Sequence, residues 1–250
     1  METAVLAHTK KKLKQLLGFS KRVEAVKPIR QQEVEKLYQE NDFLEAYSLH
    51  TDLRVEVDPH AAIGGMWEEM GQHQFDFLVR QGLLPQHRML DIGCGTLRGG
   101  RHYIRYLDPG NYYGIDISRK ALDYGEQLVQ QEGLSDKQPH LWLNEKKTLT
   151  FEQFDGKSFD YLLAQSVFTH LRAEDIEQCF QNIGRILHDR SVFYFTYYKA
   201  DANRQTTLKT FCYPFSFFEK LADQFGFQVK DCSGDYNHPR GQQMAALRLR

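Results

Sequence analysis

The feature that most constrains the fold is a short apolar run that ends in an acid and a cluster of glycines. Residues 89–100 read MLDIGCGTLRGG. An apolar run of this length that stops at glycines is typical of a buried strand. Glycines let the backbone turn sharply and let a ligand approach it closely. This stretch therefore predicts the first strand-to-helix turn of an α/β sheet, with a ligand site at the turn.

Strand-like and helix-like segments alternate after this turn. We expect strands at residues 88–92, 112–115, 140–143, 159–164, 192–197, 228–232 and 244–249. We expect helices at residues 97–107, 119–132, 174–187 and 217–225, the last opened by a capping box at 216–219. This alternation predicts a doubly wound, mostly parallel, seven-stranded Rossmann-like sheet. Because no helix is expected between the last two strands, the final strand should be antiparallel.

Basic charge is concentrated before this region. Residues 1–30 hold eight Lys and Arg against two acids, whereas the remainder holds 24 basic and 31 acidic side chains. Helical spacing predicts helices at residues 9–17, 31–47 and 66–81. We therefore divide the chain into a basic N-terminal helical extension, residues 1–65, and a catalytic domain, residues 66–250.

Composition excludes several classes of protein. Hydrophobic residues at 41% and charged residues at 26% are ordinary for a globular protein. No apolar stretch approaches the roughly 20 residues that span a bilayer, and the first eight residues lack the pattern of a secretion signal. The four cysteines are scattered without C-x-x-C spacing, which disfavours a zinc site. We expect a cytoplasmic protein with reduced thiols and no metal site.

Two acids distinguish between possible nucleotide ligands. Asp91 ends the first predicted strand, and Asp116 lies 25 residues later at the tip of the second, where an acid can bind ribose hydroxyls. A dinucleotide loop would have a third glycine where this chain has Arg98. The charge of Asp91 would repel a pyrophosphate but attract the ammonium and sulfonium of S-adenosylmethionine. Charge therefore favours S-adenosylmethionine over NAD.

These residues resemble the class I S-adenosylmethionine-dependent methyltransferases. The resemblance covers about residues 66–250, with specific motifs at 90–100 and 114–116, and the stretch 159–171 resembles the family's fourth strand and its following turn. It implies that the glycine loop cradles the methionine part of the cofactor and that the second-strand acid holds the ribose. The family often has glycine where this chain has Leu97. The implied cofactor contacts are Asp91, Gly93, Cys94, Gly95, Asp116, Ile117, Asn144 and Gln165.

An acceptor should bind at the same edge of the sheet, outside the carboxyl ends of the strands. The polar and aromatic loop 234–242 joins the last two strands there, and such loops often carry recognition, although it also suits a plain solvated turn. A hydroxyl nucleophile needs a base, for which His170 and His238 are candidates, although either could be a packed or surface histidine. The candidate acceptor contacts are Tyr197, Tyr236, His238 and Arg240.

The acceptor class is inferred from motifs that the sequence lacks. No Asn-Pro-Pro or Asp-Pro-Pro follows the fourth strand and no Pro-Cys pair exists, so DNA is not the expected partner. A hydroxyl of a small molecule, sugar or glycolipid remains. Two alternatives stay open, a non-catalytic methyltransferase-like binding protein and a methyltransferase acting on RNA. Residues 9–30 offer a basic segment for RNA or for an anionic membrane surface, or simply a solvated helix.

Overall fold

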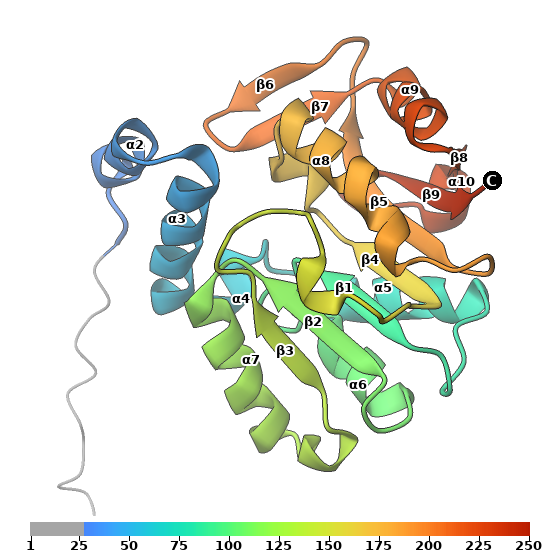
Figure 1. The fold of residues 1–250 in the computed structure, drawn as a ribbon. Coiled ribbons are helices and arrows are strands. Elements are labelled where there is room, and N and C mark those ends of the chain that lie inside the picture. Colours follow the sequence, from blue (N-terminus) through green and yellow to red (C-terminus); the bar gives the residue numbers. More distant parts are fainter. Residues whose placement is uncertain (1–27) are drawn as a thin grey trace, which may run out of the picture.

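The computed structural model describes residues 28–250, so the helix predicted at 9–17 and the proposed contacts of that segment lie outside the described residues. Within this range the chain forms a nine-stranded sheet flanked by helices (Figure 1). None of the described helices is long and apolar enough to cross a membrane. The strands are β1 (Met89–Ile92), β2 (Tyr112–Asp116), β3 (His140–Leu143), β4 (Tyr161–Ala164), β5 (Val192–Lys199), β6 (Arg204–Thr207), β7 (Thr210–Tyr213), β8 (Phe227–Asp231) and β9 (Gln243–Leu249).

The topology confirms the predicted fold class. Strands β3, β2, β1, β4 and β5 lie side by side and parallel, with Asp91 opposite Gly114 on β2 and Leu163 on β4. Strand β9 runs antiparallel to both β5 and β8, as expected for the last two strands. Because β1 has β2 on one side and β4 on the other, the chain reverses its winding direction at this point. Doubly wound sheets bind their ligands at such a reversal.

A hairpin of β6 and β7 was not predicted. Strand β7 pairs in parallel with the end of β5, where Tyr198 lies opposite Cys212. All four residues of β6 are polar and exposed, so this strand has no apolar alternation that could predict it.

The core fills both faces of the sheet. Successive residues of β4 point to opposite faces, so that Leu162 joins one apolar cluster and Leu163 the other. One face is covered by α5 (Trp67–Arg80), α6 (Gly100–Tyr106), α7 (Arg119–Gln131) and the short α10 (Ser233–Tyr236), and the other by α8 (Ala173–Ile183) and α9 (Phe215–Phe225) (Figure 1). Strands covered on both faces read as apolar runs, which is why the sequence revealed them.

Three predicted helix details need correction. Helix α9 begins at Phe215 after Pro214 and has no side-chain cap, so the capping box at 216–219 is wrong. The helix expected at 174–187 ends at Ile183 and continues as a 3-10 turn. Helix α10 also interrupts the connection between β8 and β9, where none was expected.

The helix predicted at 31–47 is in fact two helices, α2 (Gln31–Glu40) and α3 (Phe43–Val57), followed by α4 (Pro59–Ala62). Asn41 adopts an extended backbone and its side-chain amide donates to the Leu37 carbonyl at 3.0 Å, which ends α2. Helix α3 is fixed to the turn after β2, because Ser48 Oγ donates to the Ile117 carbonyl at 2.7 Å. It therefore lies beside the carboxyl edge of the sheet (Figure 1).

The helix predicted at 97–107 begins only at Gly100, because Leu97 adopts a left-handed backbone with a φ of 65°. A left-handed backbone costs a non-glycine residue about 1–2 kcal/mol. The side chain compensates by packing, since Leu97 is fully buried. It occupies space that Gly100 and Gly125 leave free, where added Cβ atoms would lie 2.7 and 3.0 Å from it. Leucine thus keeps a turn that the family often builds with glycine.

Substitutions at Leu97 test this balance. We expect Leu97→Ala to lower the free energy of unfolding by about 2–5 kcal/mol, because a buried side chain is lost. Leu97→Gly should cost about 1 kcal/mol less than Leu97→Ala, since glycine relieves the left-handed strain. Urea denaturation followed by circular dichroism measures both. At the buried control Leu128, inside α7, the alanine variant should be the more stable of the two. If the alanine variant were the more stable of the two at both positions, the left-handed strain at Leu97 would be contradicted.

Candidate functional site

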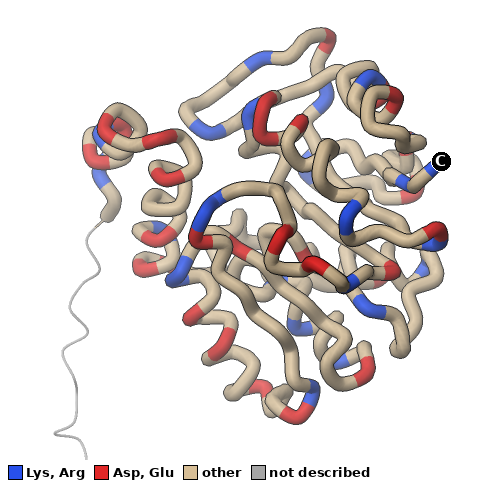
Figure 2. The backbone as a smooth tube through the Cα atoms, viewed as in Figure 1, with Lys and Arg blue, Asp and Glu red and all other residues tan. Residues whose placement is uncertain are grey.

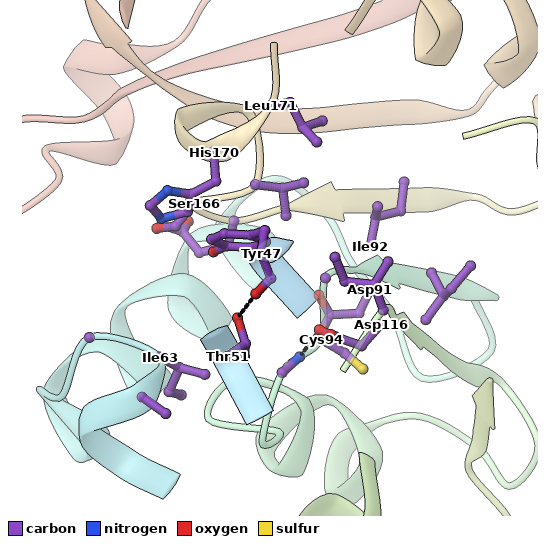
Figure 3. A pocket seen from close by; sticks show the side chains of 18 of the residues that line it. Tyr47, Thr51, Ile63, Asp91, Ile92, Cys94, Asp116, Ser166, His170 and Leu171 are labelled. Carbon is purple, nitrogen blue, oxygen red and sulfur yellow. Dashed lines mark hydrogen bonds between the residues drawn. The ribbon is translucent and has the colours of Figure 1, made fainter. Parts of the chain in front are cut away.

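A cavity of about 330 Å³ opens at the carboxyl ends of β1, β2 and β4 (Figure 3). Helix α3 and the turn after α4 close another side, so part of the segment assigned to the extension contributes to the lining. The boundary at residue 65 stays a prediction. All eight expected cofactor residues line this cavity, namely Asp91, Gly93, Cys94, Gly95, Asp116, Ile117, Asn144 and Gln165.

Asp116 ties the glycine loop to the second strand. Its Oδ2 accepts the backbone N–H of Gly95 at 2.8 Å, and its Oδ1 accepts that of Ser118, also at 2.8 Å. Figure 3 shows the first of these bonds beside Cys94. Burial raises the pKa of Asp116, and the two N–H groups oppose this by stabilising the carboxylate. Asp116 therefore has a structural role as well as its expected place in the site.

Asp91 is the more deeply buried acid, with 4% of its surface exposed. The hydroxyl of Tyr112 donates to its Oδ2 at 2.9 Å. Burial raises the pKa of Asp91 to about 7, against the opposing effect of the Tyr112 hydrogen bond. The charge of Asp116 raises this pKa further, and that of Arg98 lowers it. A cation in the cavity would therefore be needed to hold Asp91 fully ionised at neutral pH.

The glycines are required by both backbone and space. Gly93 has a φ of 71°, and a Cβ there would lie 2.5 Å from Cγ2 of Val167, in the turn after β4. Gly95 has a φ of 54°, and its Cβ would lie 2.9 Å from Cγ2 of Ile63, in the turn after α4. Neither position accepts a side chain without strain. The loop is thus enclosed between two other segments that also line the cavity.

Two guanidinium groups lie at the Asp91 end of the cavity. Arg98 is 8% exposed, and its Nη1 donates to the carbonyls of Ile63 and Gly65 at 3.1 and 2.8 Å. Its Nε has no hydrogen-bond partner among the described residues. Burial lowers the pKa of Arg98 to about 10, so the group stays charged at neutral pH. Arg240, which the sequence analysis assigned to the acceptor, also lines the cavity and donates to the Gly64 carbonyl.

The structure does not bring Tyr197, Tyr236 or His238 to the cavity, so their expected acceptor contacts are corrected. The hydroxyl of Tyr236 donates to Oε1 of Gln165 at 2.6 Å. Nε2 of His238 lies 3.1 Å from Nε2 of Gln165. Tyr197 is buried against Phe218, with ring centres 4.7 Å apart. Tyr236 and His238 therefore point inward and hold the side chain of Gln165 in position.

His170 lines the other end of the cavity, next to Tyr47 (Figure 3). Its Nδ1 lies 2.6 Å from the carbonyl oxygen of Lys209, which can only accept, so Nδ1 carries the proton. The neutral ring then has its lone pair on Nε2, which has no partner among residues 28–250. Burial lowers the pKa of His170 to about 4 and keeps the ring neutral at pH 7. The rings of Tyr47 and His170 stack with their centres 5.1 Å apart.

Several lining residues were missed by the sequence interpretation. Ser166 directly follows the fourth strand and Arg98 lies inside the loop, so both positions could have been identified from the motifs. Those on α3 and in the β6–β7 turn had no motif to mark them. The missed polar residues are Tyr47, Thr51, Arg54, Gln74, Arg98, Lys147, Ser166, Tyr198 and Lys209, whereas Gln242 belongs to the predicted loop 234–242.

Comparisons with known proteins agree with this geometry. Residues 90–193 match the family model of a methyltransferase domain. The sterol 24-C-methyltransferase of Aspergillus fumigatus is 24% identical over 127 residues, which are 51% of this chain and 32% of that protein. The chain thus spans about a third of the length of that relative.

Two solved structures share the fold. Magnesium protoporphyrin IX methyltransferase from Synechocystis PCC 6803, with S-adenosylmethionine bound, has a TM-score of 0.56 and 17% identity, covering 86% of this chain and 88% of that one. The [4+2]-cyclase SpnF has a TM-score of 0.61 and 14% identity, covering 84% and 97%. At these identities the likeness shows the fold alone. Together, the methyltransferase domain matched at residues 90–193, the sheet order and the loop between Asp91 and Asp116 support a class I S-adenosylmethionine-dependent methyltransferase.

Proposed function

We propose that this protein transfers a methyl group from S-adenosylmethionine to a hydroxyl of a small molecule, sugar or glycolipid. One observation supports this most strongly. A single cavity is lined both by the cofactor-loop residues and by a neutral histidine whose Nε2 is free to accept a proton. The pairing of a methyl-donor site with a base is what oxygen methylation needs.

The residues at the strand ends fit the cofactor. S-adenosylmethionine carries an ammonium, a sulfonium and a carboxylate. Asp91 would hold the ammonium, and its pKa near 7 leaves it responsive to such a cation. The buried, unpartnered Nε of Arg98 and the side chain of Arg240 would hold the carboxylate. By the resemblance to the family, Asp116 would hold the ribose and Asn144 would lie near the adenine; the side-chain amide of Asn144 also donates to the Thr148 carbonyl at 2.8 Å.

His170 would act on the acceptor. When bound, S-adenosylmethionine supplies a methyl group on a positively charged sulfur, which departs as a neutral thioether. Nε2 of His170 would take the hydroxyl proton as the oxygen–carbon bond forms, while Nδ1 stays bonded to the Lys209 carbonyl. Tyr47 stacks on the imidazole and fixes its plane. The remaining work of the chain is to position the acceptor and to exclude water.

The alternatives are less well supported. The hydrogen bond of His170 to the Lys209 carbonyl also suits a non-catalytic role, but its Nε2 without a partner among residues 28–250 favours the catalytic one. The fold can support other reactions, as the related cyclase illustrates, so the activity needs its own test. The name of the fungal relative indicates transfer to carbon, which makes a carbon acceptor the main competing reaction. Methylation of RNA depends on residues 9–30, most of which lie outside the described part.

The raised pKa of Asp91 predicts how cofactor affinity depends on pH. The free carboxyl is protonated below about pH 7, whereas the bound ammonium requires the carboxylate. Affinity for S-adenosylmethionine should therefore rise by roughly tenfold per pH unit between about pH 5 and 7 and then level off. Calorimetry measures this. Asp91→Asn should bind weakly and almost independently of pH, whereas the exposed control Asp123→Asn should behave as wild type. A wild-type profile in Asp91→Asn would refute the assignment.

The role of His170 is tested by the rate of methyl transfer. Labelled cofactor with pools of hydroxylated small molecules, glycans and glycolipids first identifies an acceptor. His170→Gln should then lower kcat by about 10²–10⁴-fold while the affinity for S-adenosylhomocysteine stays unchanged. The matched control is His188→Gln, at a histidine that pairs with Asp160 outside the cavity. A wild-type kcat in His170→Gln would contradict the role of His170 as the base. If the protein binds the cofactor but transfers methyl to no pool, the non-catalytic alternative is favoured.

A further inference from the structure

Charged side chains line the cavity in two groups, and the acidic group also contains Arg98 and Arg240. The acids that line it, Asp91 and Asp116, both lie at the ends of strands. Arg54 on α3 and Lys209 in the β6–β7 turn line the cavity near His170, and we call this part the cationic end. Figure 3 shows Tyr47 between His170 and the two acids.

The side chains of the cationic end are close to one another. The ammonium of Lys209 lies 5.8 Å from the centre of the Tyr47 ring. Besides burial, the charges of Lys209 and Arg54 both contribute to the low pKa of His170. Burial, followed by the charge of Arg54, lowers the pKa of Lys209 itself to about 8. Two partly desolvated cations therefore repel each other beside the proposed base.

Neither cation has an acidic partner. Among residues 28–250 no carboxylate oxygen lies within ion-pair distance of Arg54 or Lys209, whereas Lys147, the third cation here, pairs with Glu45 at 2.8 Å. Within the described part of the chain, Arg54 donates only to the Ala61 carbonyl, at 2.7 Å. Over the rest of the described backbone both signs of charge are interspersed (Figure 2). Partly buried charge without a counterion is unfavourable, so this end is suited to a ligand that brings its own negative charge.

The carboxylate of the cofactor does not account for these cations. Arg98 and Arg240 line the cavity beside Asp91, and the charges of Asp91 and Arg240 both act on the pKa of Arg98. Two guanidiniums are thus already available at the acidic end, where the ammonium of the same amino acid would bind. The cationic end is left for the second substrate.

We propose that the acceptor carries a carboxylate or phosphate group next to its hydroxyl, and that Arg54 and Lys209 bind this anionic group. The inference rests on the proposed function and specifies its substrate class. Because the Lys209 backbone also holds His170, one turn would position both the anion and the base. Binding of the anion would present the neighbouring hydroxyl to Nε2 of His170.

Direct binding to the full-length protein saturated with S-adenosylhomocysteine tests this proposal. The probes are benzoate, phenyl phosphate and the neutral phenol, titrated by calorimetry. We expect one or both anions to bind at least about tenfold more tightly than phenol, because charge-assisted hydrogen bonds exceed neutral ones. The comparison of benzoate with phenyl phosphate distinguishes a carboxylate from a phosphate acceptor. The wild-type preference requires no variant and so does not depend on the folding of one.

Charge-neutralising variants locate the site. Arg54→Gln with Lys209→Gln should abolish the preference for anions and leave the affinity for S-adenosylhomocysteine within about twofold of wild type. The single variant Lys209→Arg keeps the positive charge and should keep most of the preference for anions. The control is Arg204→Gln with Lys220→Gln, which removes the same charge from exposed positions outside the cavity.

The outcomes separate this inference from the proposed function. Failure of the wild-type protein to bind S-adenosylhomocysteine would overturn the proposed function itself. Normal cofactor binding with equal or undetectable binding of the three probes would overturn only the anionic acceptor. The inference also fails if the control variant loses as much anion affinity as the test variant. A large loss of cofactor affinity in the test variant would reassign Arg54 and Lys209 to the cofactor.

Discussion

The site depends first on two hydrogen bonds that backbone N–H groups donate to the buried carboxylate of Asp116. One belongs to Gly95 and fixes the glycine loop, and the other belongs to Ser118 and fixes the start of α7. The hydroxyl of Ser118 donates in turn to Asp52 on α3 at 2.5 Å. The same short chain of hydrogen bonds thus holds the cofactor loop and the helix that brings Tyr47 and Arg54 to the cavity. Without these bonds, the burial of Asp116 would be unfavourable.

The cavity combines charges that the fold alone would not favour. Asp91 has a raised pKa, whereas Arg98 and Lys209 have lowered ones, and burial is the main cause in each case. An oppositely charged ligand would therefore move each of these pKa values back toward the ordinary value of the group. Ligands that bind only the folded chain also stabilise it, so the bound protein should be markedly more stable than the free one. Asp91 with Arg98 and Arg240 would bind the cofactor, and Arg54 with Lys209 would bind the acceptor.

The sequence predicted those features that local chemistry specifies. The apolar runs of the central strands revealed the doubly wound sheet, and the residues between Asp91 and Gly95 marked the edge where the cavity lies. Other features depend on tertiary contacts. Strand β6 is polar and exposed, and Arg54 and Lys209 reach the cavity from segments without a motif. The loop after β8 was interpreted correctly only in part, because Arg240 and Gln242 line the cavity, whereas Tyr236 and His238 turn inward and hold Gln165.

The central claim is that one cavity, built around Asp91, Gly95 and Asp116, binds S-adenosylmethionine. Competition calorimetry tests it most directly, with S-adenosylmethionine, S-adenosylhomocysteine and NAD titrated singly and against one another. The account predicts that the first two bind in a 1:1 ratio and displace each other, and that NAD releases no heat, because Asp91 disfavours a pyrophosphate. Measurable binding of NAD, with no heat from either sulfur compound, would contradict the account.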